Sequence, residues 1–284
     1  MKIFITGITG SLGNAIVPKL LDRGYEVVGL SRDEYKIANY KYKVKIILGD
    51  IRDVDSIVKG SRGCGVIYHL AALKHVDFME ENIAQCILTN LISTGNVIKA
   101  QKENSVSRIV FTSTDKAVYP INAYGNCKAL SEKIILKSSF NNVVCRYGNV
   151  FNSRGSVIQK FIHQLQFSKE VTITNDKMSR FFITLNDAAN FVIEASLDIK
   201  AGLCIPTMKA VNIVRLVDLI AKVLNVNGYR IKFIGLRPGE KINESLVTEF
   251  DKHENEKYKF RHITSENAAQ FNDDELLEII RAEI

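Results

Sequence analysis

Short apolar runs alternate with amphipathic stretches over the first half of the chain. The runs that predict strands lie at residues 2–6, 25–30, 44–48, 65–70, 108–112 and 142–146. Helical patterns fill the intervals, at residues 14–23, 54–59, 83–103 and 123–137. Apolar strands separated by helices are typical of a parallel sheet covered on both faces. We therefore predict an α/β fold, a Rossmann-type doubly wound parallel sheet.

The regular alternation ends near residue 147. Turns and polar loops follow, with helical patterns at 157–166, 186–197 and 214–224, and short strands at 171–174, 203–206 and 230–234. We expect residues 203–206 to return to the large sheet. The predicted organisation is a Rossmann domain of residues 1–150, to which 186–207 return, and a smaller discontinuous C-terminal substrate lobe of residues 151–185 and 208–284. A ligand cleft is expected between the two bodies.

Three glycines lie between the first predicted strand and the first predicted helix. Gly7, Gly10 and Gly13 are spaced three apart. Glycines at this turn allow close backbone approach, so the helix N-terminus faces the pyrophosphate of a dinucleotide. The second strand ends at Ser31-Arg32, where an NAD enzyme commonly has an acidic residue, and this favours NADP. The acidic Asp33 follows directly, and Arg32 as a solvated loop charge stays an alternative.

A second group of polar residues follows the strand at 108–112. Ser113-Thr114-Asp115-Lys116 comes directly after it, and Tyr124-x-x-x-Lys128 opens the next helix. Tyr124 and Lys128 are four apart and share one helix face. An ammonium beside a phenol lowers the pKa of the phenol, as a catalytic base requires. The alternative is an ordinary pair of helix residues, since this spacing also arises by chance.

Composition excludes several classes of protein. The net charge is +7, but the basic residues are dispersed and no aromatic nucleic-acid motif accompanies them, so nucleic acid is not an expected partner. No apolar run has transmembrane length, and no secretory signal is evident, so we expect no membrane association and a cytoplasmic location. The five cysteines are scattered, which predicts reduced thiols and no metal site.

The chain resembles the extended short-chain dehydrogenases/reductases and, within them, the C5-inverting UDP-N-acetylglucosamine 4,6-dehydratases. The most specific matches are Ser113-Thr114-Asp115-Lys116-Ala117 and Arg237-Pro238-Gly239-Glu240-Lys241. Further matches are Gly49-Asp50-Ile51, Ala71-Ala72-Leu73-Lys74, Arg146-Tyr147-Gly148-Asn149, Ser153-Arg154-Gly155 and Met178-Ser179-Arg180. The chain departs from that family at Asn243, where a His is usual, and in the Tyr-Gly-Asn-Cys-Lys segment that ends at Lys128.

The resemblance implies NADP as cofactor, UDP-N-acetylglucosamine as substrate and a homo-oligomer, dimer or hexamer. The cofactor contacts it implies are Gly7, Thr9, Gly10, Ser11, Leu12, Gly13, Ser31, Arg32, Asp50, Ile51, Ala71, Ala72, Lys74, Asn90, Tyr124 and Lys128. It implies substrate contacts at Lys74, Asn149, Arg154, Arg180, Arg237 and Glu240, and catalytic roles for Thr114, Asp115, Lys116, Tyr124 and Lys128.

The implied reaction oxidises C4 of the sugar, removes water across C5 and C6, and returns hydride to C6. Tyr124 is expected to take the proton of the C4 hydroxyl. Lys116, with a lowered pKa, is expected to be the base at C5, and Asp115 the acid for the departing C6 hydroxyl. Two alternatives stay open: a UDP-sugar 4-epimerase, which needs no such pair, and a nucleotide-binding protein without catalysis. A further alternative is that Asp115 and Lys116 form an ion pair with a structural role and no catalytic one.

Overall fold

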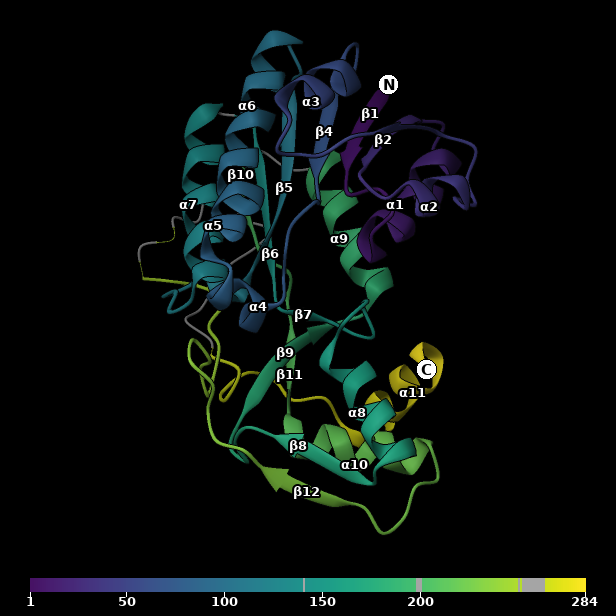
Figure 1. The fold of residues 1–284 in the computed structure, drawn as a ribbon, viewed down its shortest axis with the longest axis vertical. Coiled ribbons are helices and arrows are strands. Elements are labelled where there is room, and N and C mark those ends of the chain that lie inside the picture. The colour runs from purple at the N-terminus through teal and green to yellow at the C-terminus, as the bar shows by residue number, and fades with distance from the viewer. Residues whose placement is uncertain (140, 198–200, 250, 252–263) are drawn as a thin grey trace.

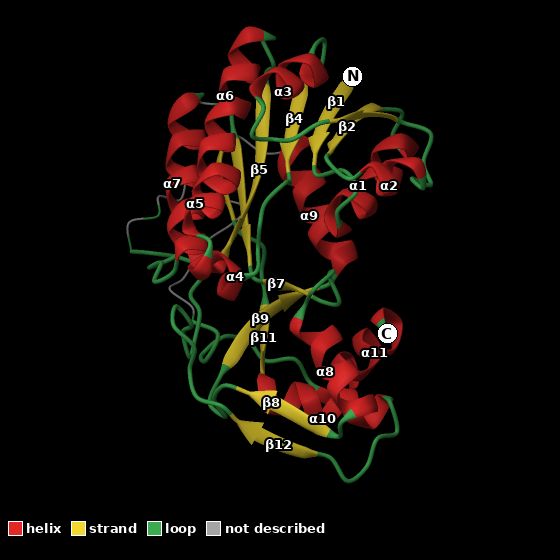
Figure 2. Ribbon diagram, viewed as in Figure 1, coloured by secondary structure: helices red, strands yellow, loops and turns green. Residues whose placement is uncertain are grey.

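The computed structural model describes residues 1–139, 141–197, 201–249, 251 and 264–284. Its largest element is a seven-stranded sheet with the order β10-β6-β5-β4-β1-β2-β3 (Figures 1 and 2). Its strands are β1 (Lys2–Thr6), β2 (Glu26–Ser31), β3 (Lys45–Leu48), β4 (Val66–His69), β5 (Arg108–Thr114), β6 (Val143–Tyr147) and β10 (Gly202–Cys204). All their pairings are parallel. The predicted doubly wound α/β fold is confirmed, and so is the strand that returns to the sheet.

Both faces of the large sheet are buried under helices (Figure 1). Ile3 and Ile5 of β1 belong to a core cluster with side chains of the helices on one face, and Phe4 belongs to the cluster on the other face. This alternation explains why the strands are apolar throughout. The principal covering helices are α1 (Ser11–Asp22) and α9 (Leu185–Leu197) on one face, and α3 (Val54–Ser61), α6 (Ser93–Glu103) and α7 (Ala123–Ser138) on the other.

The helix predicted over 83–103 is confirmed, but its middle is π-helical rather than α-helical. It consists of α5 (Ile83–Cys86), a π-helical segment η1 (Ile87–Ile92) and α6. Within η1, the backbone carbonyl of Asn90 accepts hydrogen bonds from the hydroxyls of Thr94 and Ser131. Hydroxyls that bond to helix carbonyls widen the turn, and π-turns often occur at functional sites. Two short helices, α2 (Glu34–Ala38) and α4 (Val76–Glu81), were not predicted.

A second body is built from the C-terminal half of the chain (Figure 1). A core cluster of its own includes Phe161, Leu216 and Leu276. Its elements are α8 (Val157–Phe167), β8 (Glu170–Ile173), α10 (Ile213–Val223), β12 (Arg230–Phe233) and α11 (Asp273–Glu283). A three-stranded sheet lies between the two bodies, formed by β7 (Asn149–Val150), β9 (Ser179–Ile183) and β11 (Lys209–Asn212).

The sequence pattern failed at β9, β11 and α11. Polar loops were expected around residues 175–185, but β9 is buried along its whole length. Its charged residue, Arg180, is tolerated there because the guanidinium donates to the backbone carbonyls of Ser179, Lys241 and Ile242. From sequence alone, a buried charged residue whose hydrogen bonds are satisfied cannot be distinguished from a charged residue at the surface.

Two expectations from composition concern the state of the cysteines and the presence of membrane-spanning helices. All five cysteines are buried and free, as predicted. Among the helices of the described residues, none has the length and apolar character needed to cross a membrane.

Candidate active site

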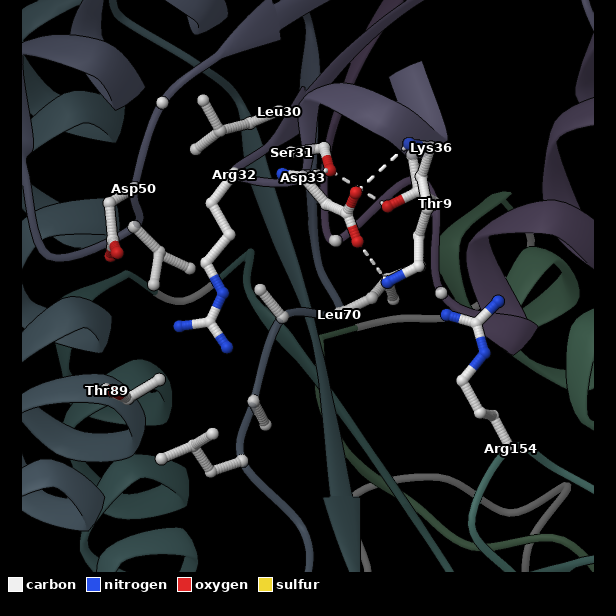
Figure 3. Close-up of a pocket in the computed structure, with 17 residues that line it drawn as sticks. Thr9, Leu30, Ser31, Arg32, Asp33, Lys36, Asp50, Leu70, Thr89 and Arg154 are labelled. Atoms are coloured by element: carbon white, nitrogen blue, oxygen red, sulfur yellow. Dashed lines mark hydrogen bonds and ion pairs between the residues drawn. The ribbon is translucent and has the colours of Figure 1, made fainter. Parts of the chain in front are cut away.

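A cavity of about 340 Å³ opens at the carboxyl ends of β1, β2 and β4 (Figure 3). This is the edge where an open parallel sheet binds ligands, beside the point at which the strand order reverses. The predicted cofactor residues that line it are Gly7, Thr9, Gly10, Ser31, Arg32, Asp50, Ile51, Ala71 and Ala72. Residues that line it without having been predicted include Leu30, Lys36, Leu70, Leu73 and Thr89.

The glycine turn at this cavity has the properties that a dinucleotide needs. Gly7 has φ +73°, and a Cβ built on it would lie 2.9 Å from the Cα of Ala71. Helix α1 starts after Gly10 without a side-chain cap and without an acidic residue in its first turn. Its first amide groups and the positive end of its dipole are therefore available to an anion. These residues fit the pyrophosphate of a dinucleotide.

Arg32 and Asp33 follow the end of β2, where the ribose of a bound dinucleotide is expected. Arg32 extends into the cavity next to Asp50 (Figure 3). Asp33 caps α2 instead, with its carboxylate accepting from the Lys36 amide at 3.0 Å and pairing with the Lys36 ammonium. The Lys36 ammonium bond is the largest cause that lowers the pKa of Asp33. Arg32 is therefore the more available group, and Asp33 is already neutralised.

The other predicted cofactor residues do not line this cavity. They are Ser11, Leu12, Gly13, Lys74, Asn90, Tyr124 and Lys128. Gly13 is required by packing, because a Cβ there would lie 2.3 Å from the carbonyl oxygen of Ile8. Asn90 binds the backbone of Leu73 twice, accepting from its amide at 2.8 Å and donating to its carbonyl at 2.9 Å. Asn90 thus anchors the loop that carries part of the cavity wall.

The predicted acid–amine pair lies at the end of β5. The Oδ1 of Asp115 accepts from Thr114 Oγ1 and from Lys116 Nζ, each at 2.9 Å. Asp115 is fully buried, and its Oδ2 has no hydrogen-bond partner among the described residues. A buried carboxylate oxygen without a donor is costly, and such atoms are common at functional sites.

Lys116 does not have the lowered pKa that the sequence analysis expected. Its Nζ lies 2.9 Å from Asp115 and 3.8 Å from the Oε1 of Glu244. Burial lowers the pKa of Lys116, but the two carboxylates outweigh burial and leave that pKa raised. The lowered pKa that a neutral amine requires is therefore not found in this arrangement, in which Asp115 and the unforeseen Glu244 both face Lys116.

Tyr124 and Lys128 are close to the pair but differ from expectation. Burial, followed by the charge of Asp115, raises the pKa of Tyr124, while a hydrogen bond with Thr114 lowers it. Lys128 donates to the Thr112 carbonyl at 2.8 Å, and burial lowers its own pKa to about 8. The expected lowering of the Tyr124 pKa by Lys128 is therefore not found here, because burial and the charge of Asp115 raise that pKa.

A second cavity, of about 390 Å³, adjoins the first where Leu73 is followed by Lys74. Five of the six predicted substrate residues line it: Lys74, Asn149, Arg180, Arg237 and Glu240. The sixth, Arg154, lines the first cavity (Figure 3). Of the catalytic residues, Lys116 lines the second cavity, and Thr114, Asp115, Tyr124 and Lys128 lie outside both linings.

The side chains in the second cavity are partly engaged with one another. Arg237 pairs with Asp77 and, at 3.2 Å, with Glu240. Sequence reasoning missed Glu244, which lines the cavity beside Lys116. The available signal was its place three residues after Lys241 in the matched Arg-Pro-Gly-Glu-Lys block.

Known proteins match this chain along most of its length. The sequence profile of the family described as "Polysaccharide biosynthesis protein" matches residues 3–266. A protein named UDP-glucose 4-epimerase from Rickettsia rickettsii is 40% identical over 264 residues, which cover 87% of this chain and 77% of that protein. The crystal structure of Pen from Bacillus thuringiensis is 31% identical with a TM-score of 0.91, covering 99% of this chain and 97% of that one.

A more distant structure shares the fold. DesIV from Streptomyces venezuelae, named dTDP-glucose 4,6-dehydratase and solved with NAD and TYD bound, is 19% identical. It has a TM-score of 0.79 and covers 99% of this chain and 96% of that one. With the family profile, the parallel sheet and the glycine turn in agreement, the chain belongs to the polysaccharide biosynthesis protein family of extended short-chain dehydrogenases/reductases.

Proposed function

We propose that this chain is a UDP-N-acetylglucosamine 4,6-dehydratase that inverts C5, with a nicotinamide dinucleotide in the first cavity and the UDP-sugar in the second. The observation that carries the proposal is the pair of Asp115 and Lys116, joined at 2.9 Å, with Lys116 at the wall of the second cavity. An enzyme that only oxidises and reduces C4 has no need of an acid and an amine at this place.

The cofactor is held by the glycine turn, the α1 N-terminus and the loops after β2 and β4. A nicotinamide bound there would supply hydride transfer, from C4 of the sugar and back to C6. Arg32 offers a guanidinium fork to a 2′-phosphate, and Asp33 is neutralised by Lys36, so NADP is preferred. The related dehydratase DesIV was solved with NAD, and affinity measurements for both dinucleotides decide between them.

The UDP moiety is held by the cationic wall of the second cavity. Lys74, Lys160, Arg180 and Arg237 line it. Guanidinium and ammonium groups suit a diphosphate. Arg237 is the most available guanidinium, because its present partners Asp77 and Glu240 are themselves partly exposed. Arg180 is committed to backbone carbonyls and contributes charge and shape.

The chain's own groups move the protons. Tyr124, hydrogen-bonded to Thr114, takes up the proton of the C4 hydroxyl in its phenolate form. Asp115 and Lys116 share the proton removed from C5 and the proton delivered to the departing C6 oxygen. An amine in the place where configuration-retaining relatives have a second carboxylate favours delivery of the returning C5 proton from the opposite face, hence inversion.

A UDP-sugar 4-epimerase is the second candidate, because the Rickettsia rickettsii relative carries that name at 40% identity. Incubation with UDP-N-acetylglucosamine in deuterated water, followed by NMR of the product, separates the two. We expect a 4-keto-6-deoxy sugar with deuterium at an inverted C5. A product with its C6 hydroxyl intact and no deuterium at C5 contradicts the dehydratase and supports the epimerase.

The proposal includes the two-body organisation and self-association. Residues 1–150 and 186–207 serve the dinucleotide, and residues 151–185 and 208–284 serve the sugar nucleotide. Apolar side chains are exposed on neighbouring helices, with Ile83 and Ile92 about half exposed on α5 and η1, and Leu130 likewise on α7. Burial of such a face between two copies of the chain supports a dimer or a hexamer.

A further inference from the structure

Glu244 contacts the predicted catalytic group at Lys116 but was not predicted to belong to it. Its side chain is 4% exposed, and its Oε1 lies 3.8 Å from Lys116 Nζ. Its Oε2 lies 3.4 Å from Lys241 Nζ and makes no hydrogen bond within the described structure. A carboxylate almost removed from water is strongly disfavoured unless cations neutralise it. The two nearby ammonium groups therefore stabilise the buried Glu244 carboxylate in this position.

Glu244 belongs to the C-terminal part of the chain and is held there independently of Lys116. Its amide donates to the Ser265 hydroxyl at 3.0 Å, and the Ser265 amide donates to the Glu244 carbonyl at 2.8 Å. The Ser265 hydroxyl in turn donates to the backbone carbonyl of Ser179 in β9. The carboxylate is thus presented to Lys116 by a backbone that these hydrogen bonds tie to β9, while Asp115 reaches Lys116 from the end of β5.

The charges around Lys116 favour its ammonium form. Asp115 and Glu244 face it with negative charge, and Arg180 opposes them with a weaker effect. Lys241, which offsets part of the Glu244 charge, also donates to the Val118 carbonyl at 2.7 Å. Two carboxylates around one ammonium keep Lys116 in its protonated form, which can donate a proton and cannot accept one.

We propose that Glu244 is a positioning residue that holds the Lys116 ammonium at the second cavity and so makes Lys116 the proton donor, and Asp115 the base, of the elimination. This inference rests on the proposed dehydratase activity. Asp115 takes the proton from C5, the C5 electron pair forms the C5–C6 double bond, and the C6–O bond breaks. Lys116 gives one proton to the departing oxygen, which leaves as water. The proton on Asp115 then passes to the neutral Lys116 across their 2.9 Å contact, so the pair is restored.

The protonation of Lys116 can be measured without turnover. Acetylation of Lys116 by acetic anhydride at pH 9, followed by mass spectrometry, reports the fraction of neutral amine in the full-length protein. Loss of a carboxylate at this distance lowers a lysine pKa by about one to two units, so labelling of Glu244→Gln should be roughly 10- to 100-fold faster than wild type. Glu244→Asp keeps the charge and should restore slow labelling. Glu266→Gln, an exposed residue near Asn243, is the matched control and should match wild type.

Turnover gives the second readout. Glu244→Gln should lose activity on the alkaline side about one to two pH units below wild type, because the reactive form is the ammonium. Equal labelling of Glu244→Gln and wild type overturns the proposal, and so does faster labelling with an unmoved pH profile. If wild type forms no 4-keto-6-deoxy product, the proposed function fails, while the labelling comparison still decides what Glu244 does to Lys116.

Discussion

Replacement of Gly7 by alanine tests the close approach of the glycine turn to the loop after β4. Gly7 has φ +73°, and an added Cβ would lie 2.9 Å from Ala71 Cα and 3.0 Å from the Ala71 amide nitrogen. The left-handed conformation costs an alanine about 1–2 kcal/mol. Overpacking against backbone adds about 1–3 kcal/mol. We therefore expect Gly7→Ala to lower the free energy of unfolding by about 2–5 kcal/mol.

Gly24→Ala is the matched control, because Gly24 has φ +77° and nothing lies within 4 Å of an added Cβ. It should lose only the conformational part, about 1–2 kcal/mol. The entropy effect on the unfolded chain is common to both variants and cancels. Urea unfolding gives the two energies, and titration calorimetry gives dinucleotide affinity, which should fall for Gly7→Ala alone because Ala71 lines the cavity. Equal losses of stability in the two variants would refute the close-approach argument.

Three further predictions follow. Arg32→Ala should weaken NADP binding by roughly 10- to 100-fold in calorimetry and leave NAD binding nearly unchanged, since a charged hydrogen bond contributes about 1.5–3 kcal/mol; equal loss of both would remove Arg32 as the discriminating group. Lys128→Met should abolish turnover yet stabilise the fold by up to about 3 kcal/mol below pH 8, because burial lowers the Lys128 pKa from 10.5 to about 8. Below pH 8 the buried Lys128 is charged, and this charge destabilises the native state. The gain in unfolding free energy of Lys128→Met, measured by urea unfolding, should therefore fade between pH 8 and 10.5. A gain that grows with pH would contradict this. Leu130→Glu should shift the sedimentation of the protein towards the monomer, and an unchanged oligomer would exclude this face of α7.

The sequence predicted the large sheet well because its central strands are buried on both faces. A run such as Ile109–Phe111 in β5 has no polar side chain to expose, and its length is too short for a helix. The same reasoning failed at β9, where Ser179 and Arg180 are polar but buried. The burial of Arg180 depends on carbonyl acceptors contributed by residues 241 and 242, which no local pattern can reveal.

The site was predictable where its residues are neighbours in sequence and not where the fold alone brings them together. Asp115 and Lys116 are adjacent, and Tyr124 lies on the helix that follows, so strand-end and helix-face rules locate them. Glu244 reaches Lys116 from a distant segment and, together with the nearer Asp115, raises the Lys116 pKa where a lowered one was expected. Protonation states depend on all charges within a few ångströms, so motif residues alone were insufficient to assign acid and base.

Helix α7 and the Arg-Pro-Gly-Glu-Lys block hold each other in place. Asn122 caps α7 by accepting from the Gly125 amide at 2.7 Å, and its side-chain amide donates to the Gly239 carbonyl at 2.8 Å. A Cβ on Gly239, which has φ +76°, would lie 2.8 Å from the Cβ of Asn122. The block that faces the substrate cavity is thus packed directly on the start of the helix that carries Tyr124.

The same C-terminal segment is fixed again further along α7. Glu132 binds Arg146 of β6 through two hydrogen bonds, at 3.0 and 2.6 Å. Arg146 also donates to the Leu246 carbonyl at 2.9 Å and to Asp251 at 2.7 Å. Buried charge networks of this kind are strongly destabilised when one partner is lost, so they specify one arrangement. Glu244 lies in the sequence between these two attachments, so contacts with α7 and with β6 help to hold its carboxylate beside Lys116.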